Sequence, residues 1–410
     1  MDKDFFKVKH LDQVFEHMAL FARIDGEPVE LSEAEGRILA QDIQSDIDLP
    51  GFRRSTVDGY ALRASTTFGA SEGNPAFAVI RGEVAMGGIP DRPIGAGEAC
   101  KMPTGGMLPE GADAVAMVEH IALLDDTTLE IYRSVAPGQH VIERDEDFRR
   151  NQTVLNRGRI IRPQEMGLLA AFGRETVTVY KRPAVAIIST GDEIVSIDRS
   201  PEPGQIRDMN SYTLAGLIRR AGGLPVPYGI VPDDFESLLE TCRQALEQTD
   251  MVLISGGSSV GARDFTVEVL SSLPEADILV HGISISPGKP TILARLGAKA
   301  FWGLPGHVVS AMVVFDVVVR PFLHHIGGLD ADPAAARRIP ARLSRSISSA
   351  QGRADFVRVR LREHDGARWA EPILGKSGLI HTMIQADGLI EVGINTEGLD
   401  RGAVVDVKLF

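Results

Sequence analysis

Cysteine is scarce in this chain of 410 residues: only Cys100 and Cys242 occur. Two cysteines exclude a disulfide framework and a cysteine-rich zinc site. Positive charge is also in deficit, because 43 Lys and Arg face 56 Asp and Glu and leave a net charge of -13. Such an acidic chain does not form a general nucleic-acid surface or a basic membrane patch. We therefore expect no nucleic-acid partner, and a polyanionic ligand must be held by local cations, backbone N–H groups or a metal ion.

Long hydrophobic runs are missing as well. The longest one, residues 311–319, contains Asp316 and ends at Arg320, so it is too short to span a bilayer. The N-terminus has no basic segment followed by an apolar run, which is the pattern of a secretory signal. We expect no membrane partner and a cytoplasmic location.

Common nucleotide and metal motifs are also absent. The chain has no Gly-x-x-x-x-Gly-Lys-Ser/Thr loop, no Gly-x-Gly-x-x-Gly in its first βα turn and no His-Glu-x-x-His. These absences exclude a P-loop ATPase and a zinc protease of that type, and they argue against a dinucleotide site.

The length predicts two to four domains. Apolar residues at helical spacing mark residues 1–47 and 140–175, and we expect these two segments to form one discontinuous helical domain. Between them, residues 48–139 are rich in Pro, Gly and short β-type runs, which indicates a β-rich inserted domain. Strands and helices alternate in residues 176–328, which predicts a doubly wound α/β domain. Residues 329–410 return to β patterns and predict a small barrel or sandwich.

A glycine-rich turn is the most informative stretch of the α/β segment. It follows the buried apolar run 251–254 and is made of Ser255, Gly256, Gly257, Ser258, Ser259, Val260 and Gly261. A turn of this kind before a helix presents backbone N–H groups to an anion. Asp264 comes directly after it, and an anion seat beside a carboxylate points to a bridging Mg²⁺. The alternative is a tight strand-to-helix turn with Asp264 as the N-cap.

Other strand ends carry similar residues. In doubly wound folds ligands bind at the carboxyl ends of the strands. Here those ends are the loops 190–193, 232–234, 255–264, 287–290 and 304–307. With Asp58 from the β-rich segment, the acids Glu193, Asp233 and Asp264 suit Mg²⁺ against a phosphate-rich ligand. Asp233 can instead be an N-cap in a capping box with Glu236. Lys289 either meets an anion or is solvated.

Seven ordered motifs then carry a family resemblance. They are residues 56–61 (TVDGYA), 103–105 with 109–115 (PTG and PEGADAV), 189–193 (STGDE), 204–206 with 208–212 (GQI and DMNSY), 255–261 with Asp264 (SGGSSVG), 287–290 (PGKP) and 303–306 (GLPG). Over nearly its whole length the chain resembles the molybdopterin molybdenumtransferase family, which includes bacterial MoeA and the E domain of gephyrin.

The resemblance implies a four-domain, elongated homodimer whose α/β domain is similar to molybdopterin adenylyltransferase. It implies a reaction in which molybdate is inserted into adenylylated molybdopterin with Mg²⁺-dependent release of AMP, and a contact with the adenylyltransferase is expected. The site would lie between the α/β domain of one subunit and the β-rich domain of the other. By position, the functional acids are Asp58, Glu193, Asp233 and Asp264, the last three being the expected metal ligands, and Thr104 is the functional threonine.

The same resemblance assigns substrate-binding positions beyond the glycine-rich turn. They are Ser286, Lys289, Pro305, His307, Arg353 and Ser377. Two of them depart from the family pattern: Ser286 stands where many members have Lys, and His307-Val308 replaces Asn-Pro. His307 either supplies a donor to the oxyanion or caps the following helix. These departures leave open a paralogue that prefers tungstate. The clustering role of gephyrin leaves open a scaffold or binding protein without turnover, although the presence of all the functional acids argues against it.

Overall fold

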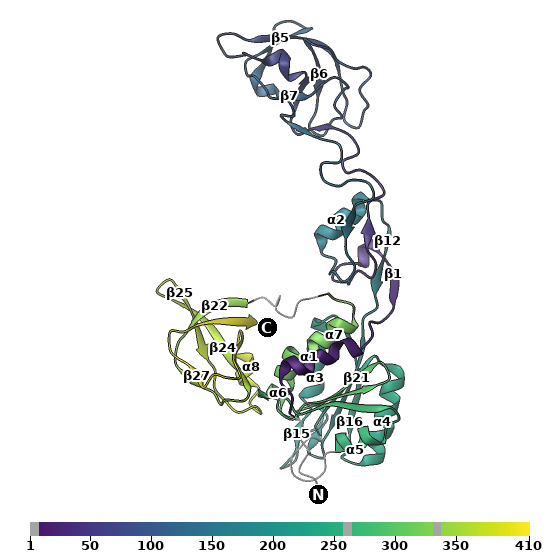
Figure 1. The fold of residues 1–410 in the computed structure, drawn as a ribbon, viewed down its shortest axis with the longest axis vertical. Coiled ribbons are helices and arrows are strands. Elements are labelled where there is room, and N and C mark those ends of the chain that lie inside the picture. Colours follow the sequence, from purple (N-terminus) through teal and green to yellow (C-terminus); the bar gives the residue numbers. More distant parts are fainter. Residues whose placement is uncertain (1–7, 257–264, 331–337) are drawn as a thin grey trace. The chain divides into compact units, whose positions relative to one another are not determined.

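The computed structural model describes residues 8–256, 265–330 and 338–410. The chain divides into two compact units (Figure 1). Unit 1 comprises residues 1–41, 157–167 and 175–410, and unit 2 comprises residues 42–156 and 168–174.

The centre of unit 1 is a six-stranded sheet with the strand order β16-β13-β17-β21-β20-β18. The strands are β13 (Ala184–Thr190), β16 (Leu224–Val231), β17 (Met251–Ser255), β18 (Ala276–His281), β20 (Ile292–Leu296) and β21 (Lys299–Leu304). The first four in spatial order run parallel. β17 is buried throughout and β13 from its second residue onward. Such continuous apolar strands are typical of a parallel sheet covered on both faces.

Helices cover both faces of this sheet, as the doubly wound prediction requires. On β13, Val185 and Ile187 face one core with α3 (Asn210–Arg220) and the helix that follows β21. The alternate residues, Ala186 and Ile188, face a second core with α4 (Phe235–Gln248) and α5 (Phe265–Ser272). The period-two alternation of a strand therefore separates the two cores.

The helix after β21 is the longest in the described part of the chain. It runs through α6 (Val308–Val314), a π-helical turn (Phe315–Val319) and α7 (Arg320–Ile326). Among the described residues it alone is long and apolar enough to cross a membrane, but 72% of its most apolar window is buried inside the protein. Trp302 and Phe322 pack edge to face with ring centroids 5.0 Å apart. This helix is the core helix of unit 1.

The apolar run at residues 278–286 does not form one continuous strand. The structure has β18 up to His281 and then a separate two-residue strand, β19 (Ile285–Ser286). The sequence reading also missed β20, which pairs antiparallel with both β18 and β21. A short apolar run after Pro290 carries no periodicity of its own, so only pairing with its neighbours makes it a strand.

The helical content predicted for residues 1–47 and 140–175 is too high. Helices there are short: α1 covers Leu11–Glu16 and α2 covers Pro163–Ala171. In unit 1, β1 (Gly26–Glu30) pairs antiparallel with β12 (Thr176–Tyr180), which lies far away in sequence. Tertiary pairing overrides local propensity here, and Pro28 is tolerated because β1 is an edge strand.

Unit 2 contains a β-sheet with the order β7-β4-β6-β5-β9-β8. Its strands are β4 (Gly59–Leu62), β5 (Ala76–Glu83), β6 (Glu98–Met102), β7 (Ala114–Met117), β8 (Ile121–Leu123) and β9 (Thr128–Ile131). A hairpin around residues 125–127 joins β8 and β9. Two short strand pairs complete the unit: β2 (Ile43–Gln44) with β11 (Thr153–Leu155), and β3 (Arg54–Ser55) with β10 (Val141–Ile142).

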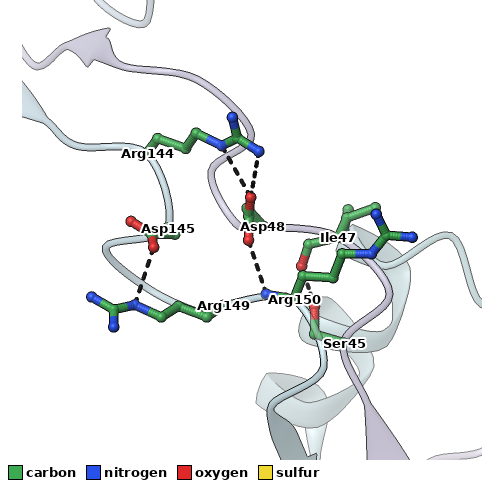
Figure 2. A network of polar contacts seen from close by, with 7 residues as sticks. All are labelled: Ser45, Ile47, Asp48, Arg144, Asp145, Arg149 and Arg150. Atoms are coloured by element: carbon green, nitrogen blue, oxygen red, sulfur yellow. Dashed lines mark hydrogen bonds and ion pairs between the residues drawn. The ribbon is translucent and has the colours of Figure 1, made fainter.

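A polar network holds the two chain segments that lead into and out of this sheet (Figure 2). Asp48 accepts hydrogen bonds from the Arg144 side chain at 2.6 and 3.0 Å and from the Arg150 backbone N–H at 2.9 Å. The backbone donor and then the Arg144 guanidinium lower the Asp48 pKa. Arg149 pairs with Asp145 at 3.0 Å beside it. The contacts of Asp48 with Arg144 and Arg150 therefore connect the two segments within unit 2.

The C-terminal part of unit 1 forms the predicted small barrel. Five strands close on themselves because β24 pairs with both β25 and β26. They are β22 (Arg338–Leu343), β24 (Ala354–His364), β25 (Ala367–Pro372), β26 (Gly388–Val392) and β28 (Val404–Leu409), with a minor pair of β23 (Ile347–Ser348) and β27 (Gly398–Leu399) and the short helix α8 (His381–Ile384). β19 adds to β24 in parallel, so the barrel is continuous with the α/β domain through a backbone ladder.

Candidate functional site

The carboxyl ends of the parallel strands meet at one edge of the sheet. Ser189 on β13 is opposite Ser255 on β17, which in turn is opposite Leu304 on β21. Thr190 is opposite Val231, the last residue of β16. The loops that follow these strands therefore start at the same level, as predicted for a ligand site of this fold.

The loop after β16 is fixed to the end of β13. The Thr190 hydroxyl donates a hydrogen bond to Oδ1 of Asp233, and the backbone N–H of Asp233 donates to Oδ1 of Asp192 at 3.3 Å. The N-cap of α4 is Asp234, whose carboxylate accepts from the Ser237 N–H at 3.2 Å. The alternative that Asp233 caps this helix is therefore wrong, because the cap is one residue later. The Asp233 carboxylate is left at the strand ends.

Glu193 is the second predicted acid in this region, and it lines a cavity. Within the described residues its carboxylate has no hydrogen bond or ion pair. Gly191, two residues earlier, has a φ of 149°, and a Cβ there would lie 2.7 Å from Oε2 of Glu193. A side chain at position 191 would push the carboxylate away, so the glycine lets Glu193 lie against its own loop.

Gly256 begins the glycine-rich turn in close contact with the β13 loop. Its φ is 110°, and a Cβ built on it would lie 2.0 Å from the carbonyl oxygen of Thr190. Only glycine fits such an approach of two backbones. The remaining predicted residues of this turn, Gly257, Ser258, Ser259, Gly261 and Asp264, lie outside the described residues. Both interpretations of Asp264, as metal ligand and as N-cap, fall there too.

A cavity of about 1130 Å³ lies between the strand ends and the C-terminal barrel, entirely within unit 1. It is larger than most sites for drug-sized ligands. The described predicted residues that line it are Glu193, Gly256, Ser286, Lys289, Pro305, His307, Arg353 and Ser377. Eight predicted positions from separate strand ends and from the barrel are thus brought to one place. Ser255, which is fully buried, and Asp233 are not among the lining residues.

His307 occupies the N-cap position of α6, but its side chain makes no capping hydrogen bond. The ring Nδ1 instead lies 2.8 Å from the Ser377 hydroxyl, across the cavity wall in the barrel. The Ser377 carbonyl accepts from the Val309 N–H at 3.1 Å. On the same loop the Asn210 amide donates to the Gly306 carbonyl at 2.8 Å. The side chain of His307 therefore joins the α/β domain to the barrel rather than capping the helix.

Arg353 and Ser286 lie where β19 meets β24. Arg353 Nε pairs with Oδ1 of Asp355 at 3.0 Å, and Oδ2 of Asp355 accepts from the Ser349 hydroxyl at 2.7 Å. Ser286 is the register partner of Asp355. Asp355 is buried whereas the Arg353 side chain is about half exposed, so the buried carboxylate orients a cation at the cavity rim.

Lys289 is held on a tight loop after β19. Its carbonyl accepts from the N–H groups of Ile283 and Thr291, both at 2.9 Å. Gly288 has a φ of 118°, and a Cβ there would lie 2.4 Å from Val314. The glycine lets the loop press on the core helix, and Lys289 then lines the cavity as a cation.

Asp58 and Thr104 meet in unit 2. Oδ1 of Asp58 accepts from the Thr104 N–H at 2.7 Å and from its hydroxyl at 3.0 Å. These two bonds, the backbone one first, lower the Asp58 pKa, so the carboxylate is ionised at neutral pH. Gly59 follows at the start of β4, where a Cβ would lie 2.1 Å from the Ala116 carbonyl. Asp58 and Thr104, both predicted as functional residues, are therefore in direct contact.

The expected Mg²⁺ site can be tested on donor chemistry. Among the described residues, no three His, Cys, Asp or Glu side chains gather as a metal-binding group. Mg²⁺ is usually held by only one or two carboxylates, with substrate phosphates and water completing its shell. Glu193 in the cavity, and Asp233 with Oδ1 bonded to Thr190, provide oxygen donors of that kind. The residues present fit this ion.

Sequence reasoning gave no role to several residues that shape the site. Asp355 orients Arg353, Asn210 holds the Gly306 loop, and Thr190 holds Asp233. Arg358 lines the cavity from the face of β24 opposite to Val357 and Val359, which pack in the barrel core. Asn210 and Thr190 lie inside two of the seven sequence motifs. Their places near the site could therefore be predicted from the sequence, but their hydrogen bonds could not.

A mixed six-stranded sheet with a cavity at its strand ends, walled on the far side by a small β-barrel, defines a multidomain α/β protein with a cationic ligand cavity. Comparison with models of known protein families identifies the family within this class. The MoeA N-terminal region (domain I and II) matches residues 8–173, a "Probable molybdopterin binding domain" matches residues 186–325, and the MoeA C-terminal region (domain IV) matches residues 340–410. The chain belongs to the MoeA family, as the sequence motifs predicted.

Individual relatives agree with this assignment. The molybdopterin molybdenumtransferase of Nostoc sp. is 35% identical over 308 residues, covering 74% of this chain and 70% of the relative. That of Bacillus subtilis is 30% identical over 386 residues, covering 93% and 89%. A crystal structure of a molybdopterin biosynthesis MoeA protein from Pyrococcus horikoshii is 32% identical and superposes with a TM-score of 0.84, covering 98% of this chain and 100% of that one.

Proposed function

We propose that the protein inserts molybdate into adenylylated molybdopterin and releases AMP. One observation carries this proposal: a single cavity joins the donors Lys289, Arg353 and Ser377 to the carboxylate of Glu193. Cationic and hydroxyl donors suit an oxyanion, whereas a carboxylate suits a phosphate bridged by a divalent ion. Transfer of an oxyanion onto a nucleotide-linked pterin needs both kinds of group in one place. The relatives from Nostoc sp. and Bacillus subtilis are named molybdopterin molybdenumtransferases, which supports the same reaction.

Each group of residues has a role in this reaction. Lys289 and Arg353 attract the oxyanion by charge, and Ser377 orients it through a hydroxyl fixed by His307. The backbone N–H groups of the turn 255–261 hold the phosphate-rich part of the pterin nucleotide. The pyrophosphate bond breaks when an oxygen of water or of the oxyanion attacks phosphorus, and AMP leaves.

Mg²⁺ would be held by Glu193 and Asp233, with Asp264. Bound there, the ion would supply positive charge against the phosphates of the substrate. Thr190 keeps the Asp233 carboxylate at the strand ends through its hydroxyl. Gly191 leaves room for the Glu193 carboxylate on the same loop.

A second copy of the chain completes the site in this proposal. Asp58, hydrogen-bonded to Thr104, would act on the cavity of the neighbouring subunit in a homodimer. A fixed, ionised carboxylate on a loop of unit 2 has no structural partner other than Thr104 among the described residues, which favours a role toward a ligand. The substrate would come from a molybdopterin adenylyltransferase in contact with this protein in the cytoplasm.

A single-turnover assay tests the proposed function. The purified protein is mixed with adenylylated molybdopterin and molybdate, and AMP is measured over time with and without Mg²⁺. We expect one AMP per site, released only when Mg²⁺ is present, together with molybdenum bound to the pterin. Binding of the pterin nucleotide without AMP release would favour a non-catalytic scaffold on this fold instead.

Tungstate insertion is a second candidate because Ser286 and Val308 replace the usual Lys and Pro at the oxyanion loops. At these positions the cavity has a serine hydroxyl, and the loop at His307 has a valine after the histidine. Equal concentrations of molybdate and tungstate in the insertion assay separate the two functions. Molybdenum in excess in the product supports the main proposal, and tungsten in excess supports this one.

A further inference from the structure

Arg358 is a buried cation in the wall of the cavity. It belongs to β24, and only 8% of it is exposed. Nη1 donates to the Thr382 hydroxyl at 2.8 Å and Nη2 donates to the Gly375 carbonyl at 2.9 Å. Its Nε–H is buried and has no hydrogen-bond partner. Within the described residues, Arg358 forms no ion pair.

In the described part of unit 1, most other buried charges are paired with an opposite charge; Asp208, which accepts from the Ser211 N–H and hydroxyl, is the exception. Asp316 on the core helix pairs with Arg320 at 2.9 Å and with Lys408 at 2.8 Å. Glu165 pairs with Arg162 at 2.6 Å. A buried arginine is expected to be paired in the same way, because an isolated charge in a protein interior is costly. Arg358 has only neutral acceptors, and burial lowers its pKa.

The same arginine fixes the loop that carries Ser377. Its two acceptors, Gly375 and Thr382, lie on either side of that serine. The Thr382 hydroxyl accepts from Arg358 while donating to the Leu379 carbonyl at 2.8 Å, so its single proton is already used. The turn is therefore tied to β24 through the guanidinium.

Charge and position lead to one interpretation. The Nε–H of the guanidinium has no hydrogen-bond partner and, among the described residues, the group has no counter-ion; it lines a cavity that Lys289 and Arg353 also line. Building on the proposed function, we propose that Arg358 is a positioning and electrostatic residue of the oxyanion site. It holds the Ser377 turn against His307, and the bound oxyanion is the counter-ion that the interior lacks.

Oxyanion binding by the whole protein, without turnover, tests this role. Equilibrium dialysis with molybdate alone gives Kd for the wild type, Arg358→Gln, Arg358→Lys and the control Arg362→Gln. The glutamine keeps a donor for Gly375 but removes the charge. Arg362 lies on the same strand with an exposed side chain, so its replacement removes the same charge at the surface.

We expect Kd to rise at least tenfold in Arg358→Gln, less in Arg358→Lys and not at all in Arg362→Gln. The slope of log Kd against log salt concentration should fall only in Arg358→Gln, because one fewer charge contacts the anion. A purely structural role would weaken binding without changing this slope. Wild-type Kd and slope in Arg358→Gln would overturn the inference alone, and no molybdate binding by the wild type would overturn it together with the proposed function.

A measurement on the wild type covers the case in which Arg358→Gln does not fold. With ¹⁵N-labelled arginine, the Nε–H signal that is missing from Arg358→Lys is assigned to Arg358. Molybdate should shift this signal, because that N–H has no partner in the protein. A signal that stays unchanged at saturating molybdate would contradict the inference.

Discussion

Asp58 and Glu193 are carboxylates with different local support. Asp58 is held by two hydrogen bonds from Thr104, whereas Glu193 lines the cavity beside a glycine that leaves it room. We predict that Asp58→Ala and Glu193→Ala each slow turnover by roughly a hundredfold or more, the usual loss for one electrostatic group. Rates of AMP release measure the effect. Glu236→Ala, an exposed acid of the first turn of α4, is the control and should keep the wild-type rate.

Turnover close to wild type in both alanine variants would remove these acids from the mechanism. Loss of turnover in the Glu236 control would show that removing any surface carboxylate slows AMP release, so the effect would not be specific to the site.

At this scale the sequence predicted which residues gather but not how each one is held. The ends of apolar strands and the glycine loops predicted the position of Glu193, Lys289 and His307. Arg358 could not be assigned because the alternation at 356–362 places all its arginines on one polar face of the strand. What covers that face depends on the turn at 375–384, and a period-two pattern contains no information about it.

The first turn of α2 depends on one buried carboxylate. Glu165 accepts from the Arg162 N–H at 3.0 Å and pairs with the side chains of Arg162 and Arg159 at 2.6 and 2.8 Å. These contacts, the Arg162 side chain first, lower the Glu165 pKa to about 2. Because the folded pKa is lower than the unfolded one, the stabilisation is complete above about pH 5 and is lost as the pH falls towards 2.

We predict that Glu165→Gln destabilises the protein by about 1–3 kcal/mol at pH 7, allowing for the half-exposed arginines. The difference from the wild type should shrink steadily between about pH 5 and pH 3. Denaturant unfolding at several pH values measures it. A destabilisation that is the same at pH 3 and pH 7 would show that the ion pairs are not its cause.

Gly256 tests the contact between two strand-end loops. An alanine there meets the Thr190 carbonyl at 2.0 Å and also has to adopt a φ of 110°. Gly297, in the turn between β20 and β21, has a positive φ but nothing within 4 Å of a Cβ. We predict that Gly256→Ala lowers Tm by about 5 °C or more and Gly297→Ala by about 2 °C. Equal shifts would mean that backbone strain, and not the close approach, determines the need for glycine.

Secondary-structure elements were easiest to predict from the sequence where burial alone determines their apolar pattern. β13 and β17 are continuous apolar runs, and their place in the middle of a parallel sheet follows from that pattern. β1 and β20 were missed because each becomes a strand only through a partner elsewhere in the chain. Propensity within a short window cannot report such a partner.

For the whole molecule, composition and motif order predicted the class correctly. Alternating elements indicated the doubly wound domain, and the late β patterns indicated the barrel that β24 and β26 close. The barrel's ladder with β19 was not predictable, because β19 has two residues and no pattern of its own. That short ladder places Arg353 beside the strand-end loops, so the cavity depends on it.

Mixed dimers test the central claim, a site completed by Asp58 of a second subunit, most directly. Asp58→Ala and Glu193→Ala are each inactive in this account, but a dimer with one of each has one intact site. After subunit exchange in an equal mixture, half of the dimers are mixed, so AMP release should return to about a quarter of the wild-type rate. If the mixture stays as inactive as the two variants alone, Asp58 does not act on the cavity of its neighbour and the account is contradicted.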